Sequence, residues 1–570
     1  MDTKDRIRSK KRAGVCVSLP SVLTANSFEC GDIHSLYLLS DWATNSGMSI
    51  IQLLPLNDTG FGNSPYNSIS AFAIDPVYIS LHELGIPSYT RRKKITNHFI
   101  EKNRIRLLKL QVLHDYYIEN IPKHEEQIEI FLKDFPFLKE YVCFKVLYEH
   151  HSGKDWKTWK ENTFSTELLE KMKSTFHEEF YFQCFLQLIA YQQLKKAKEY
   201  AESKGVYIKG DMPILLSPNS ADVWAHQNYF NLDLSSGAPP DHFSSEGQNW
   251  GFPVIDWKEM KKDGYAWWKN RLVYLQNFYH LYRIDHVIGM YRIWAMDKKE
   301  GLSKRGWFEP QIGIADSEFG KIGVSARELA EKGIIKKISE GRYIFLWDFY
   351  YFPEYNQFPE EIKKALYELS VSNLEKDEAL WLESGEDILN VLESSTSMLP
   401  CAEDLGTVPG FVRDSLFKRK MIGIDVIRWT KNFQDGSFIP PESYREFAIS
   451  VLSTHDTSLA RYWWEKELLG NDKEIAKKFF EIGSEDGYIE KLIQFAYSTN
   501  SKFTINLLQD LLISDTLKLS GNYELHRINL PNTPEDQNWN YRFNFTLEDL
   551  IKEKSLSAKL RNFSKESNRV

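Results

Sequence analysis

The sequence predicts an α/β protein built as a (β/α)8 barrel of the TIM type, with inserted, largely helical subdomains. The first observation is a set of short, nearly continuous apolar runs that end in a charged or polar residue, as buried parallel strands do. The second is that helical patterns alternate with these runs, most clearly over residues 182–204. The runs lie at residues 49–57, 206–216, 281–287, 398–405, 422–429, 448–456 and 503–512.

A third observation favours a barrel over a doubly wound sheet, the other architecture that such an alternation allows. Acidic residues recur at the ends of several separate runs, where barrel enzymes assemble their sites. A doubly wound sheet would be expected to have a Gly-rich first βα turn, and none is evident. The acidic residues concerned are Asp211, Asp285, Glu403 and Asp456.

Two stretches interrupt the alternation of strands and helices. Residues 86–180 are rich in Lys and Glu and helix-like, and residues 300–395 are charged and mixed, so we expect both to be insertions. The basic start of the chain, residues 1–15, is expected to be a solvated tail, and residues 552–570 a terminal helix or a frayed tail. The predicted division is barrel at 1–85, helical insertion at 86–180, barrel with active-site loops at 181–299, second insertion at 300–395, and remaining barrel and tail at 396–570.

Composition limits the class of protein. The chain has 570 residues, of which 42% are hydrophobic and 26% charged, as in folded soluble proteins. A net charge of -8 argues against nucleic-acid binding, and no run is long enough to span a membrane. With no secretory signal pattern at the N-terminus, we expect a cytoplasmic protein. The scattered cysteines argue against a disulfide framework or a zinc site; they are Cys16, Cys30, Cys143, Cys184 and Cys401.

Aromatic residues are the informative excess, at 14% of the chain. A large aromatic core must account for most of them. Trp and Tyr also combine a flat apolar face with a polar group, and sugar rings present apolar C–H faces. A carbohydrate site is therefore one use for some of these side chains.

Arg283 and Asp285 form the sharpest local pattern. Residues two apart on a strand share a face, so the guanidinium would lie beside the carboxylate and favour its ionised form. An ionised carboxylate is what a carboxylate nucleophile requires. A structural Arg–Asp pair at the end of a strand explains the same residues, and this short pattern leaves both interpretations open.

Glu403 and Asp404 close another run. Adjacent residues at a strand end point to opposite faces, so only one is expected to enter the site. Apolar surroundings at the barrel mouth would raise the pKa of Glu403, which suits a general acid. The alternative is that one of the two acids caps the following helix.

His455 with Asp456, and Asp211 at the end of a different run, supply further polar groups. A carboxylate beside an imidazole could hydrogen-bond substrate hydroxyls, but a metal-ligand pair or a capped helix start would look the same. The absence of paired His spacing argues against a metal hydrolase.

Two carboxyl groups about 5–5.5 Å apart would permit retaining glycoside chemistry through a covalent intermediate.

Nine groups of residues, in order from about residue 14 to 543, carry a resemblance to a known family. They are Leu-Leu-Pro-Leu at 53–56, Gly-Asn-Ser-Pro-Tyr-Asn-Ser-Ile-Ser-Ala-Phe at 62–72, Gly-Asp-Met-Pro-Ile at 210–214, Ser-Ala-Asp-Val-Trp at 220–224, Gly-Gln-Asn-Trp-Gly-Phe-Pro at 247–253, Arg-Ile-Asp-His at 283–286, Ala-Glu-Asp-Leu-Gly at 402–406, Thr-His-Asp at 454–456 and Arg-Ile-Asn-Leu-Pro at 527–531. Together they resemble the 4-α-glucanotransferases called amylomaltases or disproportionating enzymes.

The resemblance implies a barrel with inserted subdomains, no cofactor and no metal. It implies that Asp285 is the nucleophile, Glu403 the acid/base and Asp456 the transition-state stabiliser. Arg283 and His455 are implied to hold the sugar in the donor site. Phe438 aligns only loosely, near the acceptor side. The residues implied to line the glucan cleft are Ser64, Tyr66, Asp211, Gln248, Trp250 and Asn529.

The implied activity is retaining transfer of an α-1,4-glucan segment from a maltooligosaccharide donor to the 4-hydroxyl of an acceptor glucan or glucose. No nucleic-acid or membrane partner is expected. The alternatives are an α-amylase-like hydrolase with water as acceptor, a non-catalytic glucan-binding scaffold and a metal-dependent hydrolase. Two departures from the compact members of the family, a longer segment between Asp285 and Glu403 and the sequence after Asn529, leave the preferred donor and acceptor open.

Overall fold

The computed structural model describes residues 3–87, 99–240, 244–483, 487–513, 516–517, 519, 521–531 and 533–570. Residues 88–98 of the predicted first insertion therefore lie outside the described part. Eight parallel strands form one sheet in the order β14-β8-β3-β2-β1-β17-β16-β15. Their bounds are β1 Arg12–Val17, β2 Ile50–Leu53, β3 Tyr207–Met212, β8 Leu281–Ile284, β14 Leu399–Ala402, β15 Gly423–Val426, β16 Ala448–Val451 and β17 Phe503–Leu507.

The two edges of this sheet meet and nearly close it into a barrel. Cys401 of β14 forms a parallel bridge with Ile422, next to β15. The amide of Ala402 donates a 2.8 Å hydrogen bond to the carbonyl of Ile422. The predicted (β/α)8 class is confirmed, and seven of the eight strands lie within the predicted apolar runs.

The eighth strand, β1, corrects the prediction of a solvated N-terminal tail. Helix α1 (Thr3–Arg8) buries Ile7 completely, and β1 pairs with both β2 and β17. The guanidinium of Arg12 lies 4.8 Å from the ring centroid of Tyr207. The prediction failed because the apolar residues of β1 follow directly on a run of Lys and Arg.

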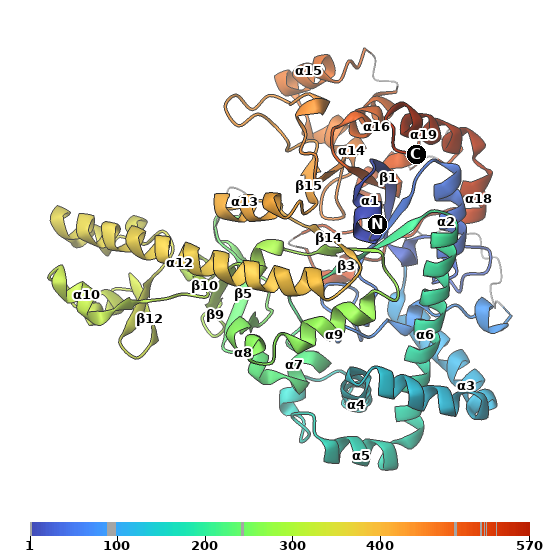
Figure 1. Cartoon of the computed structure of the whole chain (residues 1–570), viewed down its shortest axis with the longest axis horizontal. Helices are drawn as coiled ribbons and strands as arrows, with labels where there is room; N and C mark the ends of the chain where they lie inside the picture. Colours follow the sequence, from blue (N-terminus) through green and yellow to red (C-terminus); the bar gives the residue numbers. More distant parts are fainter. Residues whose placement is uncertain are drawn as a thin grey trace.

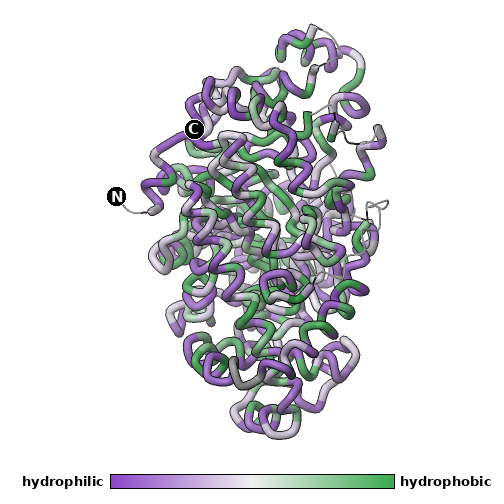
Figure 2. The backbone as a smooth tube through the Cα atoms, turned by 90° about the vertical axis from the view of Figure 1, so that its right-hand side faces the viewer, coloured by the Kyte–Doolittle hydropathy of each residue, from purple (hydrophilic) through white to green (hydrophobic). Residues whose placement is uncertain are grey.

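Alternate residues of each strand face two different cores, as the period of a strand requires. Cys16, Ile50 and Phe503 belong to a cluster built mainly from barrel strands, which fills the barrel interior. Val15 and Ile51 belong to a larger cluster that includes the surrounding helices. Figure 2 shows hydrophobic segments running through the middle of the molecule, with hydrophilic segments mainly towards its outside.

Helices follow the barrel strands along the chain, and several of them pack directly on those strands. The helices are α2 Ser35–Asn45, α6 His177–Ser203, α9 Ala266–Leu275, α13 Gly410–Lys418, α14 Ala460–Tyr462, α15 Gly470–Phe479, α16 Tyr488–Ser498, α17 Leu508–Leu511, α18 Leu547–Lys552 and α19 Lys554–Glu566. Of the two alternatives for residues 552–570, the structure has the helix, and Arg569 beyond it is fully buried and donates to the carbonyl of Tyr497 at 2.7 Å. Within the described ranges, every helix is too short or too polar to cross a membrane.

Among the described residues between β2 and α6, three α-helices pack at one end of the molecule (Figure 1). They are α3 Lys102–Asp134, α4 Phe137–His150 and α5 Thr166–Thr175. Buried ion pairs join α3 to the loop after β2. Arg106 and Lys102 lie 2.6 Å and 3.1 Å from the carboxylate of Asp75, which is fully buried.

The segments after β3 and β8 form smaller antiparallel sheets beside the barrel. A four-stranded sheet has the order β10-β9-β5-β6 and a three-stranded sheet the order β11-β13-β12. Figure 1 shows α10, β12 and the start of α12 projecting away from the barrel, so residues 300–395 combine helices with strands. The elements are β4 Phe230–Asn231, β5 Leu234–Ala238, β6 Gln248–Asn249, β7 Val254–Ile255, β9 Ile293–Asp297, β10 Trp307–Glu309, β11 Ile314–Ala315, β12 Ile335–Ser339, β13 Arg342–Phe345, α7 Ala221–Ala225, α8 Trp257–Lys262, α10 Asp316–Lys321, α11 Ala326–Glu331 and α12 Glu360–Ser394.

Candidate active site

Asp211 and Arg283 lie side by side because β3 and β8 pair in register at these two residues. Nη1 of Arg283 donates to both carboxylate oxygens of Asp211, at 2.8 Å and 3.0 Å. Both side chains are almost fully buried. A buried guanidinium needs such a partner, so Asp211 fixes the position of Arg283.

Asp285 follows the last residue of β8 and shares the same guanidinium nitrogen of Arg283 with Asp211. Its Oδ1 accepts a hydrogen bond from Nη1 of Arg283 at 2.7 Å, and its side chain is 27% exposed. Removal from bulk water raises the pKa of Asp285 to about 6, and Arg283 opposes that rise. The carboxylate is therefore ionised at neutral pH and remains accessible.

Glu403 follows β14, the strand next to β8, and its carboxylate is held by backbone amides. Oε2 accepts from the amide of His286 at 2.8 Å, and Oε1 accepts from that of Leu405 at 3.0 Å. Burial raises the pKa of Glu403, against the effect of Arg283 and of these two hydrogen bonds. The site thus holds two carboxyl groups with raised pKa values at the ends of adjacent strands.

Asp404 points away from Glu403 and has a structural role. Its Oδ1 accepts from the amide of Ile424 at 2.8 Å, and its Oδ2 accepts from Arg445 at 2.5 Å. Only Glu403 of this adjacent pair thus lies with the other site residues.

Asp456 lies after β16 in a chain of polar contacts. It accepts from Nδ2 of Asn529 at 2.7 Å and lies 3.0 Å from Nε2 of His455. Removal from water would raise the pKa of Asp456, but His455 and the hydrogen bond from Asn529 outweigh it and hold that pKa well below its usual range. The pKa of His455 is raised because Asp456 outweighs the effect of burial. His455 and Asn529 thus hold the ionised carboxylate of Asp456 in a fixed orientation.

Tyr66 connects His455 to the Asp211–Arg283 pair. Its hydroxyl donates to Oδ2 of Asp211 at 2.7 Å and lies 3.0 Å from Nε2 of His455. The rings of Tyr66 and His455 are stacked, with centroids 5.4 Å apart. Burial and Asp211 raise the pKa of Tyr66 well above its usual range, so the hydroxyl keeps its proton.

Trp250 directly follows β6 and lies beside His286, the residue after Asp285. Its indole ring meets the ring of His286 edge-on, with centroids 5.1 Å apart. Its Nε1 donates to Oε1 of Gln248 at 2.9 Å. Gln248 and Trp250 are thus joined to each other, and Trp250 contacts the segment that follows Asp285.

Ser64 and Phe438 are placed differently from the other predicted site residues. The amide of Ser64 donates to Oε1 of Glu535 at 2.8 Å, and its hydroxyl accepts from the amide of Tyr66 at 3.3 Å, so Ser64 shapes the loop that carries Tyr66. Phe438 is buried against the rings of Phe479 and Phe480. Phe438 is therefore packed as a core residue.

Trp539 belongs to this group of residues and was missed by the sequence analysis. Its ring centroid lies 5.4 Å from that of Tyr66 and 5.9 Å from that of His455. The residue has a positive φ of 64° and stands in an irregular polar segment. The one signal in the sequence is that Trp539 is an aromatic residue close to the motif that contains Asn529. That signal alone does not distinguish a site residue from a core aromatic.

Comparison with known proteins places this chain in a family. A family model described as 4-alpha-glucanotransferase matches residues 17–547. The 4-alpha-glucanotransferase of Chlamydia caviae is 30% identical over 97% of this chain and 94% of its own length. That of Chlamydia pneumoniae is 31% identical over 97% of this chain and 95% of its own.

The fold agrees with these matches. An amylomaltase from Streptococcus agalactiae, solved in complex with acarbose, superimposes with a TM-score of 0.76 and 23% identity, covering 98% of this chain and all of its own. An amylomaltase from Corynebacterium glutamicum has a TM-score of 0.70. The chain belongs to the 4-α-glucanotransferase family.

Proposed function

We propose that this chain moves an α-1,4-glucan segment from a maltooligosaccharide donor to the 4-hydroxyl of an acceptor glucan or glucose, with Asp285 as nucleophile and Glu403 as acid/base. The observation that carries the proposal is the hydrogen bond from the amide of His286, next to Asp285, to the carboxylate of Glu403. It keeps two carboxyl groups with raised pKa values beside each other at the barrel mouth.

In the first step Asp285 attacks the anomeric carbon of the donor. The glycosidic C–O bond breaks, and the proton of Glu403 passes to the leaving oxygen. The products are a glycosyl ester on Asp285, ionised Glu403 and a free shortened glucan. The pKa of Asp285, about 6, keeps this carboxylate ionised at neutral pH, while burial favours the protonated form of Glu403. Because the two groups are close, they titrate as a pair.

In the second step Glu403 acts as the base. It takes the proton of the acceptor 4-hydroxyl, whose oxygen attacks the same anomeric carbon and releases Asp285. The two displacements restore the α configuration and return both carboxyl groups to their starting protonation states. Transfer prevails over hydrolysis when an acceptor sugar occupies the place of water. We assign this acceptor contact to Trp250, whose ring lies beside that of His286.

Charge that develops on the sugar ring needs fixed partners. We assign Asp456, held by His455 and Asn529, to the stabilisation of the oxocarbenium-like transition state. Arg283 would orient Asp285, since it already donates to that carboxylate. Tyr66 and Trp539, whose rings lie together, would offer aromatic faces to a donor sugar.

The proposed location of the enzyme is the cytoplasm. All five cysteines are unpaired and buried, which suits a reducing compartment. Its substrates would then be intracellular α-glucans and the maltooligosaccharides and glucose derived from them.

Incubation with maltotriose alone tests the proposed activity. We expect glucose together with a ladder of longer maltooligosaccharides, at a constant total of reducing ends. A rise in reducing ends without longer products would mean that water is the acceptor and would replace the transferase with a hydrolase.

A further inference from the structure

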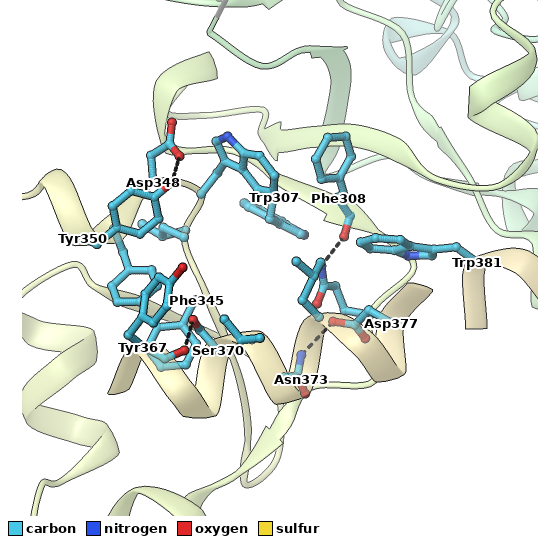
Figure 3. A pocket seen from close by; sticks show the side chains of 16 residues that line it. Trp307, Phe308, Phe345, Asp348, Tyr350, Tyr367, Ser370, Asn373, Asp377 and Trp381 are labelled. Atoms are coloured by element: carbon cyan, nitrogen blue, oxygen red, sulfur yellow. Dashed lines mark hydrogen bonds between the residues drawn. The ribbon is translucent and has the colours of Figure 1, made fainter. Parts of the chain in front are cut away.

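A cavity of about 210 Å³ lies in the segment between β9 and β14, outside the residues of the candidate active site. One face of α12 supplies Tyr367, Ser370, Leu374 and Trp381, spaced as neighbours on one side of a helix are. Strands β10 and β13 and the turn after β13 supply the other walls. Figure 3 shows Trp307, Phe308 and Trp381 on one side of the cavity and Phe345, Tyr350 and Tyr367 on the other.

The lining combines flat apolar rings with hydrogen-bonding groups. Tyr350 and Tyr367 are 37% and 49% exposed and form the entrance, whereas Trp307 and Trp381 are buried. Asp348 accepts from the hydroxyl of Tyr350 at 2.7 Å, and Asp377 accepts from Asn373 at 2.6 Å. Apolar faces with a few fixed polar groups are what a small ligand site requires, and a sugar ring matches both kinds of surface.

The charges of the cavity favour a neutral ligand. Its sixteen lining residues, all within the described ranges, include Asp348 and Asp377 but no Lys, Arg or His. Two nearby cations make cation–π contacts with rings of the lining. Arg292 lies 3.8 Å from the ring centroid of Phe308, and Lys336 lies 4.4 Å from that of Trp307. Phosphates and carboxylates would meet two acids and no base. A polyhydroxyl compound would meet acceptors for its hydroxyls.

The cavity is joined to the candidate active site by one sheet. Phe308 of β10 pairs with Trp294 of β9, Trp294 pairs with Gly237 of β5, and Gly237 pairs with Asn249 of β6. Asn249 stands between Gln248 and Trp250. Neighbouring strands lie about 4.8 Å apart, so this row of four residues is only about 14 Å long. A single glucan chain of several units is long enough to reach both places.

We propose that this cavity is a second α-glucan site, which holds one glucose unit of a long chain while another part of the same chain reacts between Asp285 and Glu403. The volume is below the roughly 300–1,000 Å³ of sites for drug-sized ligands, so it suits one ring rather than a whole oligosaccharide. The inference rests on the proposed function in one respect, that the substrate is an α-glucan. Its effect would be to raise the local concentration of long glucans at the active site.

Native gels that contain glycogen test this site without any need for turnover. All proteins carry D285N, so that the glucan stays intact. Two pocket variants are added separately, the double change Tyr350→Ala with Tyr367→Ala, and Ser370→Phe, which fills the cavity and keeps every ring. The matched control is Phe417→Ala, because Phe417 is 76% exposed on α13 and lines no part of the cavity.

We expect both pocket variants to need about five- to fifty-fold more glycogen than D285N alone for the same retardation. The double variant removes two rings that would contact the sugar, and Ser370→Phe fills the space that the sugar would occupy. The control should migrate like D285N. If the double variant unfolds, Ser370→Phe decides the question. Equal retardation of D285N and the pocket variants, or no retardation of D285N, would overturn the second site. Failure of the proposed function would appear instead in the maltotriose assay of the unchanged enzyme.

Discussion

The backbone amide of His286 donates a 2.8 Å hydrogen bond to Oε2 of Glu403. Two further backbone bonds flank it, from Glu403 to Ile284 at 2.9 Å and from Val287 to Glu403 at 3.2 Å. The adjacent strands β8 and β14 thus stay paired beyond their last regular residues. The relative position of Asp285 and Glu403 is therefore set by the backbone of the barrel and not by mobile side chains.

The change Asp285→Asn should lower kcat with maltotriose by a factor of about 10⁴, because an amide is a far weaker nucleophile than a carboxylate. The fold should survive, since Asp211 continues to neutralise Arg283. Chromatography of the products and a thermal melt measure the two effects. Near-normal transfer by this variant would remove Asp285 from its proposed role.

The change Glu403→Gln should depend on the leaving group of the donor. Maltotriose needs a proton on the departing oxygen, so its transfer should fall by about 10²–10⁴. A maltosyl fluoride needs no such proton, so its first step should be close to the wild-type rate in single-turnover measurements. Asp285→Asn is the matched control, because it should lose both donors equally. Equal losses with both donors in Glu403→Gln would argue against an acid role.

The dependence of kcat/KM on pH should be bell-shaped. Protonation of Asp285, whose pKa is about 6, removes the nucleophile, so activity should fall as the pH drops below about 6. Loss of the proton from Glu403, whose pKa is raised, should give the alkaline limb. In Glu403→Gln the alkaline limb should disappear while the acid limb stays. An unchanged alkaline limb in that variant would assign it to a different group.

Seven strands could be predicted because buried parallel strands are apolar over their whole length, and each ends at a polar residue such as Asp285 or Asp456. Strand β1 was missed because basic residues precede Ala13 and hide its start. The sequence also predicted that the adjacent acids Glu403 and Asp404 would point to opposite faces, since a strand alternates its faces, and the structure has them so. Which of the two would enter the site came from the resemblance.

The rest of the site depends on contacts that no local pattern encodes. Trp539 meets Tyr66 through a fold that brings together residues far apart in sequence. The strands within residues 300–395 were missed because they are short and charged, as in Ile335–Ser339. Their pairing with β13 and β9, and not their composition, makes them strands.

The change Asn529→Ala should lower kcat about ten- to a hundred-fold with little change in KM. Asn529 donates to Asp456 at 2.7 Å, and a hydrogen bond to a charged group is worth about 1.5–3 kcal/mol. Asn529→Asp should be worse, because it puts a second negative charge beside Asp456. Steady-state kinetics with maltotriose separate the two constants. A rise in KM alone would instead make Asn529 a residue for ground-state binding.

The change Asp75→Ala should destabilise the fold by about 3–5 kcal/mol, since it leaves the buried cations Arg106 and Lys102 without their partner. The matched control is Glu101→Ala, which removes an exposed partner of Arg104 on the same helix and should have little effect. Urea denaturation measures both free energies of unfolding. Similar values for the two variants would contradict a structural role for the buried pairs between α3 and the barrel.

The most direct test of the account is to capture the covalent intermediate. A 5-fluoro-α-glucosyl fluoride reacts with a retaining enzyme and leaves slowly, so the labelled residue can be found by peptide mass spectrometry. We expect one glycosyl adduct per chain, on Asp285, and none in Asp285→Asn. An adduct on Glu403 or Asp456 would contradict the assignment of the nucleophile, and inversion of the anomeric configuration without any adduct would contradict the double displacement itself.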